Sequence, residues 1–540
     1  MTRKYLARAA LALGTALAIG VPAGADDLSD RIDRMERELQ ELKREMQRRN
    51  AGTPAAAPAP AAPKTAEAPP PPAATPPPAV ATGPAPEKAG AMQTAGNVVD
   101  EIARRVNIGA YGSMRYEASN IDEAHSTFTF RRFVLTADGQ IAPRLKAAME
   151  LEFERFRKLE LEKKTETADG GLTVEQTVEG TNESEIALEQ AWLQYDFADW
   201  IGMRAGGILV PLGRFNLNHD DNRWDLPRRS LVDRGSPVLP STAAWSELGA
   251  GFLGTVPVGE RSNVDYQLYV VNGVALDVEF EQIIQTRSPE PSKQVIEAKV
   301  EPKTGTFGTD VKEGKAVTGR VAYSPLLGHE LAGSWYWGQY TPDFLDNEDV
   351  YSLGFDGKTG WGPFEFEGEY VFTHFDGIQN VARSLARVAR DSESEFENPD
   401  LETEIEFELS GLATNKQGYW IDGRYRFWPT FLNHTFLGKP FDNPQLVAIL
   451  RGEQVWFDDM ITEAAFGGGT LTEFETEDRF VNRITTGLAY RPVPLVVFQL
   501  AYELTQTNNG QSLAGVTNFI PAGEHEDTSH AILVGAAFGF

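Results

Sequence analysis

Residues 145–154 read LKAAMELEFE, a segment in which every odd-numbered position is apolar and the even-numbered positions are lysine, alanine and glutamate. A two-residue period of this kind predicts a β-strand with one apolar and one polar face. The same period recurs in residues 364–372, FEFEGEYVF, and in the last ten residues, AILVGAAFGF. Strands of a soluble sandwich also alternate, but here aromatic side chains lie near the strand ends, as in the lipid-facing girdle of a membrane barrel.

Turn signals and polar stretches divide the region after residue 106 into strands. Short turns alternating with long loops are typical of outer-membrane barrels, in which the long loops are external and the short turns face the periplasm. Seven turns and eight loops predict an all-β transmembrane barrel of about sixteen antiparallel strands, with both termini in the periplasm. A barrel of this size encloses a water-filled channel rather than a packed core. The turn signals lie at residues 137–139, 198–200, 256–259, 325–328, 357–363, 428–430 and 491–494, and the loops span 117–126, 155–187, 211–246, 273–316, 341–348, 374–417, 458–478 and 505–529.

Residues 1–25 read as a signal peptide. Arg3, Lys4 and Arg8 form a positively charged start, residues 11–21 are apolar, and Ala23-Gly24-Ala25 is a small-x-small cleavage motif. The apolar run is too short for a membrane anchor. We therefore expect cleavage after residue 25 and export from the cytoplasm.

Residues 26–50 carry a heptad pattern. A coiled coil places apolar side chains at alternating spacings of three and four, and its parallel form would lie in the periplasm here. About three heptads are marginal alone, so a lone amphipathic helix stays an alternative. The expected coiled-coil seam is Leu28, Ile32, Met35, Leu39, Leu42 and Met46. Residues 51–105 are rich in alanine and proline and predict a disordered, semi-rigid linker, which leaves residues 106–540 for the barrel.

Composition excludes several classes of function. The chain contains no cysteine and has a formal net charge of -28, so thiolate chemistry and nucleic-acid binding are not expected. The seven histidines show no paired metal-ligand spacing, and no G-x-S-x-G nucleophile motif occurs. We expect no enzymatic activity, no cofactor and no metal site.

Four segments resemble the phosphate-selective porin O and P family: residues 207–214 (GILVPLGR), 246–254 followed by 264–273, 418–429 (GYWIDGRYRFWP) and 487–502. The resemblance implies a homotrimer of sixteen-stranded barrels in the cell outer membrane, whose third external loop folds inward and narrows the pore. Related porins with an N-terminal coiled coil favour dicarboxylates or other organic anions. The terminal Phe540, on one stripe with Phe538, resembles the signal read by the barrel assembly machinery.

Arginines dominate the expected solute path. Arginine suits anion contact because its planar donors match carboxylate and phosphate groups. The expected pore-lining or constriction residues are Arg204, Arg214, Arg223, Arg228, Arg229, Arg234, Arg424, Arg426, Arg479 and Arg483. The alternative is a structural network that holds the third loop to the wall through pairs between its arginines and Asp220, Asp221, Asp225 and Asp233.

The sequence therefore predicts an outer-membrane diffusion channel that passes small hydrophilic solutes, preferentially anions such as phosphate or organic carboxylates. Its expected partners are small anions, outer-membrane lipid, the barrel assembly machinery and two further copies of the chain. Two alternatives stay open. One is a structural envelope protein tethered through the coiled coil. The other is a porin for cations or neutral solutes, in which inward glutamates such as Glu150 and Glu365 dominate.

Overall fold

The structure is a computed structural model that describes residues 105–121, 125–155, 159–168, 171–180, 185–233, 238–241, 244–285, 293–304, 307–308, 310–396, 402–408, 412–467, 470–507 and 528–540. The expected signal peptide, the coiled coil and all but residue 105 of the linker lie outside the described residues.

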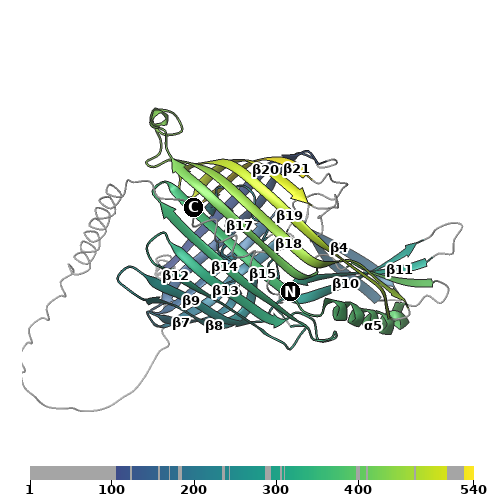
Figure 1. Cartoon of the computed structure of the whole chain (residues 1–540). Helices are drawn as coiled ribbons and strands as arrows, with labels where there is room; N and C mark the ends of the chain where they lie inside the picture. The colour runs from purple at the N-terminus through teal and green to yellow at the C-terminus, as the bar shows by residue number, and fades with distance from the viewer. Residues whose placement is uncertain are drawn as a thin grey trace, which may run out of the picture. The chain divides into compact units, whose positions relative to one another are not determined.

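A closed antiparallel β-barrel forms the body of the described chain (Figure 1). Sixteen strands of a nineteen-stranded sheet follow one another around a ring, and β21 pairs with β1 to close it, as the sequence predicted. Phe540 continues that seam, because its N–H donates to the carbonyl of Ala110 at 3.0 Å and its carbonyl accepts from the N–H of Ala110 at 3.1 Å. The ring consists of β1 (Val106–Ser119), β2 (Thr127–Ala142), β3 (Leu145–Glu154), β6 (Glu185–Ala198), β7 (Ile201–Leu209), β8 (Ser246–Pro257), β9 (Asn263–Val271), β12 (Ala316–Ser324), β13 (Glu330–Gln339), β14 (Asp349–Trp361), β15 (Phe364–Phe375), β17 (Ala413–Phe427), β18 (Gln445–Gly467), β19 (Thr470–Val493), β20 (Val496–Thr507) and β21 (Thr528–Gly539).

The two faces of the wall differ in chemistry, as the two-residue period requires. In β3, Met149 is exposed while its neighbour Glu150 is buried, and in β17 the exposed Ile421 and Tyr425 flank the buried Arg424. The outer face therefore carries exposed apolar side chains. The inner face carries charged side chains that are covered by a loop inside the barrel.

Several expected loops are instead built from regular structure. The polar stretch 458–478 is a continuation of β18 and β19, which pair as far as Phe466 and Leu471. The expectation of loops failed here because alternating glutamates and apolar residues also suit a hairpin exposed to water on both faces. The loop after β3 contains the hairpin β4 (Leu159–Ala168) and β5 (Gly171–Gly180), the loop after β9 contains β10 (Ala275–Gln285) and β11 (Lys293–Lys303), and the loop after β15 contains α5 (Ile378–Phe396) and β16 (Glu402–Glu408).

These additions extend the long-loop end of the barrel. β16 pairs in parallel with β11 and touches β18, so three loops share one sheet extension. Figure 1 shows β10, β11 and α5 beyond the end of the barrel wall. In the part of the chain that the structure describes, no helix combines the length and the apolar character needed to cross a membrane.

Two predicted short turns are wrong in detail. Residues 137–139 lie inside β2, where Asp138 pairs with Asn107 and Ala148, and the turn falls at residues 143–144. Pro143 explains the shift, because proline cannot donate to a strand ladder. The connection after β17 is long rather than short: it runs over residues 428–444 and contains the 3-10 helix η2 (Thr430–His434).

Candidate functional site

The third long connection, residues 210–245, enters the barrel instead of leaving it, and is called the inner loop below. It begins at Gly213, whose φ of 77° and close approach to Glu369 exclude a side chain: a Cβ there would lie 2.5 Å from the Glu369 carboxylate. That carboxylate accepts the backbone N–H groups of Arg214 and Phe215, both at 2.8 Å. Glu369 of β15 thereby fixes the start of α4 (Arg214–Leu217) against the wall.

Aromatic packing anchors the inner loop. Phe215 stacks on Trp224 with ring centroids 4.1 Å apart, and both meet the edge of Trp420 on β17. Leu212, Val232 and Trp245 belong to the same large buried cluster, which continues into wall strands and α5. The loop is therefore a packed element of the barrel interior.

Polar contacts tie the inner loop to widely separated strands. Asp221 accepts from Ser113 of β1 at 2.5 Å, and the N–H of Leu231 donates to Glu453 of β18 at 2.7 Å. Strands β1 and β18 lie apart on the ring, so the loop crosses the lumen between them. This arrangement agrees with the inward fold that the family resemblance implied.

Buried carboxylates surround the first arginine of the inner loop. Arg214 forms ion pairs with Glu367 and, at 2.7 Å, with Glu330, and Asp356 lies 3.6 Å away. Arg320 of β12 shares Glu330 and Asp356 at 2.9 and 2.7 Å. Four wall strands thus converge on the beginning of the loop through one network.

A second network holds the middle of the loop. Arg424 pairs with Asp422 at 2.7 Å, with Glu365 at 2.8 Å and also with Glu367, and its guanidinium lies 3.5 Å from Asp225 of the loop. Arg426, half-buried, reaches Asp225 and Glu365 at 3.4 and 3.5 Å.

Arginines of the wall also bind loop backbone. Arg491 donates to the carbonyls of Asn222, Arg223 and Trp224 at 3.0 to 3.1 Å, and pairs with Asp225 at 2.7 Å. Arg451 donates to the carbonyl of Arg228 at 3.2 Å, and Arg483 to that of Arg229 at 2.7 Å.

The remaining predicted arginines lie in different surroundings. Arg228 and Arg229 are buried, and Arg228 pairs with Glu117 and Glu503 while Arg229 pairs with Asp221. Arg223 is exposed and pairs with Asp220 at 2.8 Å. Arg479 is half-buried beside Glu477, and Arg234 lies outside the described residues.

Arg204 of β7 differs from all of these. Its Nε and Nη2 donate to Gln194 at 3.1 and 2.8 Å, and its guanidinium lies 3.9 Å from the ring centre of Trp192. Among the described carboxylates, none forms an ion pair with it. Arg204 is therefore the predicted arginine whose charge stays least neutralised.

Sequence reasoning did not single out Arg132, Arg320, Arg451 and Arg491, which belong to these networks. Their signal is the two-residue period, since Arg451 shares its face of β18 with Glu453 and both are buried. A further group, Glu150, Glu189 and His219, comes together from β3, β6 and the inner loop, and no local spacing connects these three residues.

The interior charges shift the protonation of loop residues. Burial lowers the pKa of the His219 imidazole, but nearby carboxylates, chiefly Glu189 and Asp220, outweigh burial and raise the pKa to about 9. Burial favours the neutral form of Asp221, yet Arg132 and Arg229 hold the pKa of this carboxyl well below its usual range.

No protein-family model matches the chain. It is 26% identical over 262 residues to an uncharacterized protein of Aquifex aeolicus, which covers 48% of this chain and 49% of that protein. The chain therefore spans about half the length of the curated relative it matches.

Three solved structures to which the chain is similar are outer-membrane channels or porins. Salmonella typhi OmpF in complex with daunomycin has a TM-score of 0.40 and 11% identity over 81% of this chain and 97% of that chain. An anion-selective porin from Comamonas acidovorans has a TM-score of 0.41 and 10% identity over 81% and 99%. The outer membrane channel DcaP of Acinetobacter baumannii has a TM-score of 0.38 and 10% identity over 81% and 97%.

Proposed function

We propose that this chain is an outer-membrane porin, a passive diffusion channel for small hydrophilic solutes. The observation that carries the proposal is the contrast between the two faces of the barrel wall. Leu450 and Ile484 on the outer face are 56% and 54% exposed, whereas Arg451 and Arg483, their chain neighbours, are buried inside. Apolar side chains exposed around a closed barrel suit lipid, and a charged interior suits water and polar solutes.

Arg204 supports a preference for anions within this proposal. Its guanidinium projects from β7 without an ion pair to a described carboxylate, and Trp192 covers only one face of it. An unneutralised guanidinium in a narrow pore attracts carboxylate and phosphate groups, because screening is incomplete over distances shorter than the Debye length of about 8 Å. The preferred solutes would be small organic carboxylates or phosphate, in keeping with the family resemblance.

One observation favours a cation or neutral-solute porin as the second candidate. The arginines of the inner loop that the structure describes are ion-paired, as Arg214 and Arg228 illustrate, so their charges are largely cancelled. Buried glutamates of β3, including Glu150 and Glu152, would then weigh more in the interior potential.

The assembly proposals extend beyond the barrel. We propose that residues 1–25 are removed as a signal peptide, and that residues 26–50 form a periplasmic coiled coil joined by the linker of residues 51–105 to a barrel that trimerises. The heptad pattern and the cleavage motif support them.

The experiment that tests the function reconstitutes the purified protein in a planar lipid bilayer and measures the reversal potential in a salt gradient. A porin gives stepwise conductance, and anion preference gives a potential of the sign set by the permeant anion. Absence of conductance in correctly folded protein would contradict the channel, and a cation-selective potential would favour the second candidate.

A further inference from the structure

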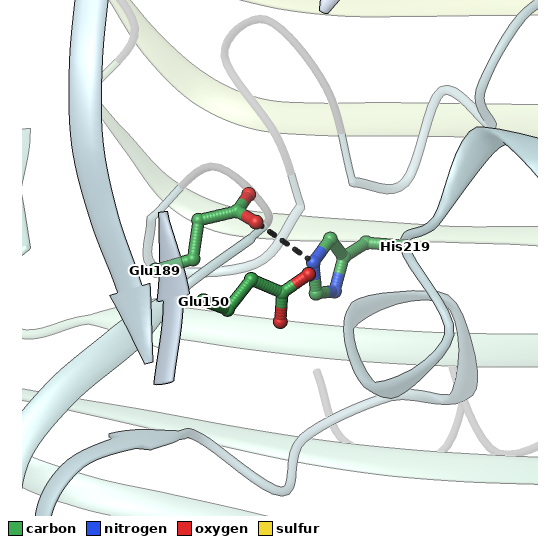
Figure 2. A group of neighbouring side chains, drawn as sticks. All are labelled: Glu150, Glu189 and His219. Carbon is green, nitrogen blue, oxygen red and sulfur yellow. Dashed lines mark ion pairs between the residues drawn. The ribbon is translucent and has the colours of Figure 1, made fainter. Parts of the chain in front are cut away.

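Three side chains meet where the inner loop touches the wall strands β3 and β6 (Figure 2). His219 comes from the loop, Glu150 from β3 and Glu189 from β6, and all three are buried. One potential ligand atom from each lies within 4.8 Å of the other two. Figure 2 shows the two carboxylates turned toward the same edge of the imidazole.

The imidazole is held in a defined orientation. Its Nδ1 lies 3.0 Å from the backbone carbonyl of Asn216, an acceptor only, so Nδ1 carries the proton in this contact. Its Nε2 faces Glu189 at 3.4 Å and has no hydrogen-bond partner in the described structure. A neutral ring would therefore turn a lone pair toward carboxylates, which is unfavourable unless a cation occupies the space between them.

The carboxylates are also prepared for a cation. Neither oxygen of the buried Glu189 has a hydrogen-bond partner in the described structure. Gln190 donates to one oxygen of Glu150 at 2.6 Å and so orients it. A second loop carboxylate, Asp220, places an oxygen 3.8 Å from His219 Nε2 while Arg223 holds it at 2.8 Å.

We propose that Glu150, Glu189 and His219 bind a divalent transition-metal cation, such as Zn²⁺, that fastens the inner loop to β3 and β6. Two ligands about 2.0–2.1 Å from one tetrahedral Zn²⁺ lie about 3.4 Å apart, close to the separation of His219 Nε2 and Glu189. A carbonyl that accepts the other ring N–H of a ligating histidine is the usual outer partner of such a site. Asp220 or water would complete the coordination.

Neighbouring charges set the balance of the site. Arg132 lies 3.8 Å from Glu189 and pairs with Glu152 at 2.7 Å, so it neutralises part of the negative charge without reaching Nε2. The competing occupant is a proton on His219. A proton bridges His219 to one carboxylate, whereas a divalent cation satisfies Glu150 and Glu189 together, and this difference favours the metal.

The test uses untagged, full-length protein purified in detergent, stripped of metal with a chelator, and then equilibrated with Zn²⁺. Mass spectrometry of the bound metal is expected to give one Zn²⁺ per chain, and calorimetry a single tight site. His219→Gln and Glu189→Gln are each expected to weaken binding by at least about a hundredfold, the upper end of what loss of an outer partner costs. His434→Gln is the matched control, because His434 is an exposed histidine in the connection after β17.

Zn²⁺ X-ray absorption on the wild-type protein keeps the test independent of how the variants fold. One nitrogen neighbour from imidazole with oxygen neighbours is expected at about 2.0–2.2 Å. Two or more histidine neighbours, no stoichiometric Zn²⁺, or unchanged affinity in both variants would each overturn the proposal.

Discussion

Arg228 of the inner loop lies 3.0 Å from Glu503 of β20, and both side chains are about 4% exposed. The same guanidinium also pairs with Glu117 of β1. Charges removed from water this far need close partners, since an uncompensated buried charge is costly. The pair therefore fixes the position of the inner loop in the lumen, whatever it contributes to the attraction of solutes.

Removing this arginine tests the structural part. Arg228→Ala with Arg229→Ala leaves Glu503 and Asp221 without their loop partners, which for a buried pair costs about 3–5 kcal/mol. We expect a loosened inner loop, seen in single-channel recordings as noisy or unstable conductance with little change in ion preference. Arg223→Ala is the control. Its side chain is 58% exposed, so the loss of its pair with Asp220 should cost about 0–1 kcal/mol and leave quiet channels.

Quiet conductance with a strongly reduced anion-to-cation permeability ratio in the double variant would contradict this expectation. It would place Arg228 and Arg229 on the solute path as an arginine constriction.

Arg204 tests selectivity. Arg204→Gln removes the guanidinium that no described carboxylate neutralises, and we expect the anion-to-cation permeability ratio to fall by about fivefold, corresponding to roughly 1 kcal/mol. The change should be largest at low salt, where screening is weakest. Reversal potentials in salt gradients at two ionic strengths measure it.

Arg204→Lys is the matched control for that variant. It keeps the charge while giving up the planar contact with Trp192 and the two bonds to Gln194. Selectivity close to wild type is expected for Lys. Equal losses in Gln and Lys would mean that geometry rather than charge governs the effect.

Much of the barrel follows from local sequence. A two-residue period fixes which side chains share a face, so Glu150, Glu152 and Glu154 could be assigned to the interior, where all three are buried. Short turns containing glycine or proline likewise gave the strand count. The error at residues 137–139 arose because Asp138-Gly139 resembles a turn, although it sits in the ladder of β2.

The pairing inside the barrel could not be read in the same way. Arg228 and Glu117 are separated by 111 positions, and their contact depends on the path that the inner loop takes across the lumen. His219 shows the same difficulty: no metal site was expected from histidine spacing, because its neighbours Glu150 and Glu189 come from two wall strands. Strand register and loop path create such groups, and a single sequence states neither.

The N-terminal heptads give a prediction independent of the barrel. Leu39→Pro or Leu42→Pro should abolish the coiled coil, because proline removes a helical hydrogen bond and clashes with the preceding turn at about 3 kcal/mol or more. A barrel trimer held by its own walls should persist. Circular dichroism of residues 26–50 fused to a trimerising scaffold measures the coil, and crosslinking of the full chain measures the trimer. Absence of helical signal in the unmodified segment would contradict the coiled coil.

Phe540 provides the final prediction. Its backbone exchanges two hydrogen bonds with Ala110 at the seam that closes the ring, and its side chain is 75% exposed on the outer face. Deleting Phe540 removes both bonds and the terminal aromatic group together. We expect less protein in the outer membrane and more in the periplasm, measured by fractionation and immunoblotting at equal expression. Phe540→Tyr, which keeps the backbone bonds and an aromatic ring, should insert normally. Phe431→Ala is a second control, because it removes an exposed aromatic residue away from the seam, in the connection after β17. Membrane yield of the deletion equal to wild type would show that seam closure and assembly do not depend on the terminal phenylalanine.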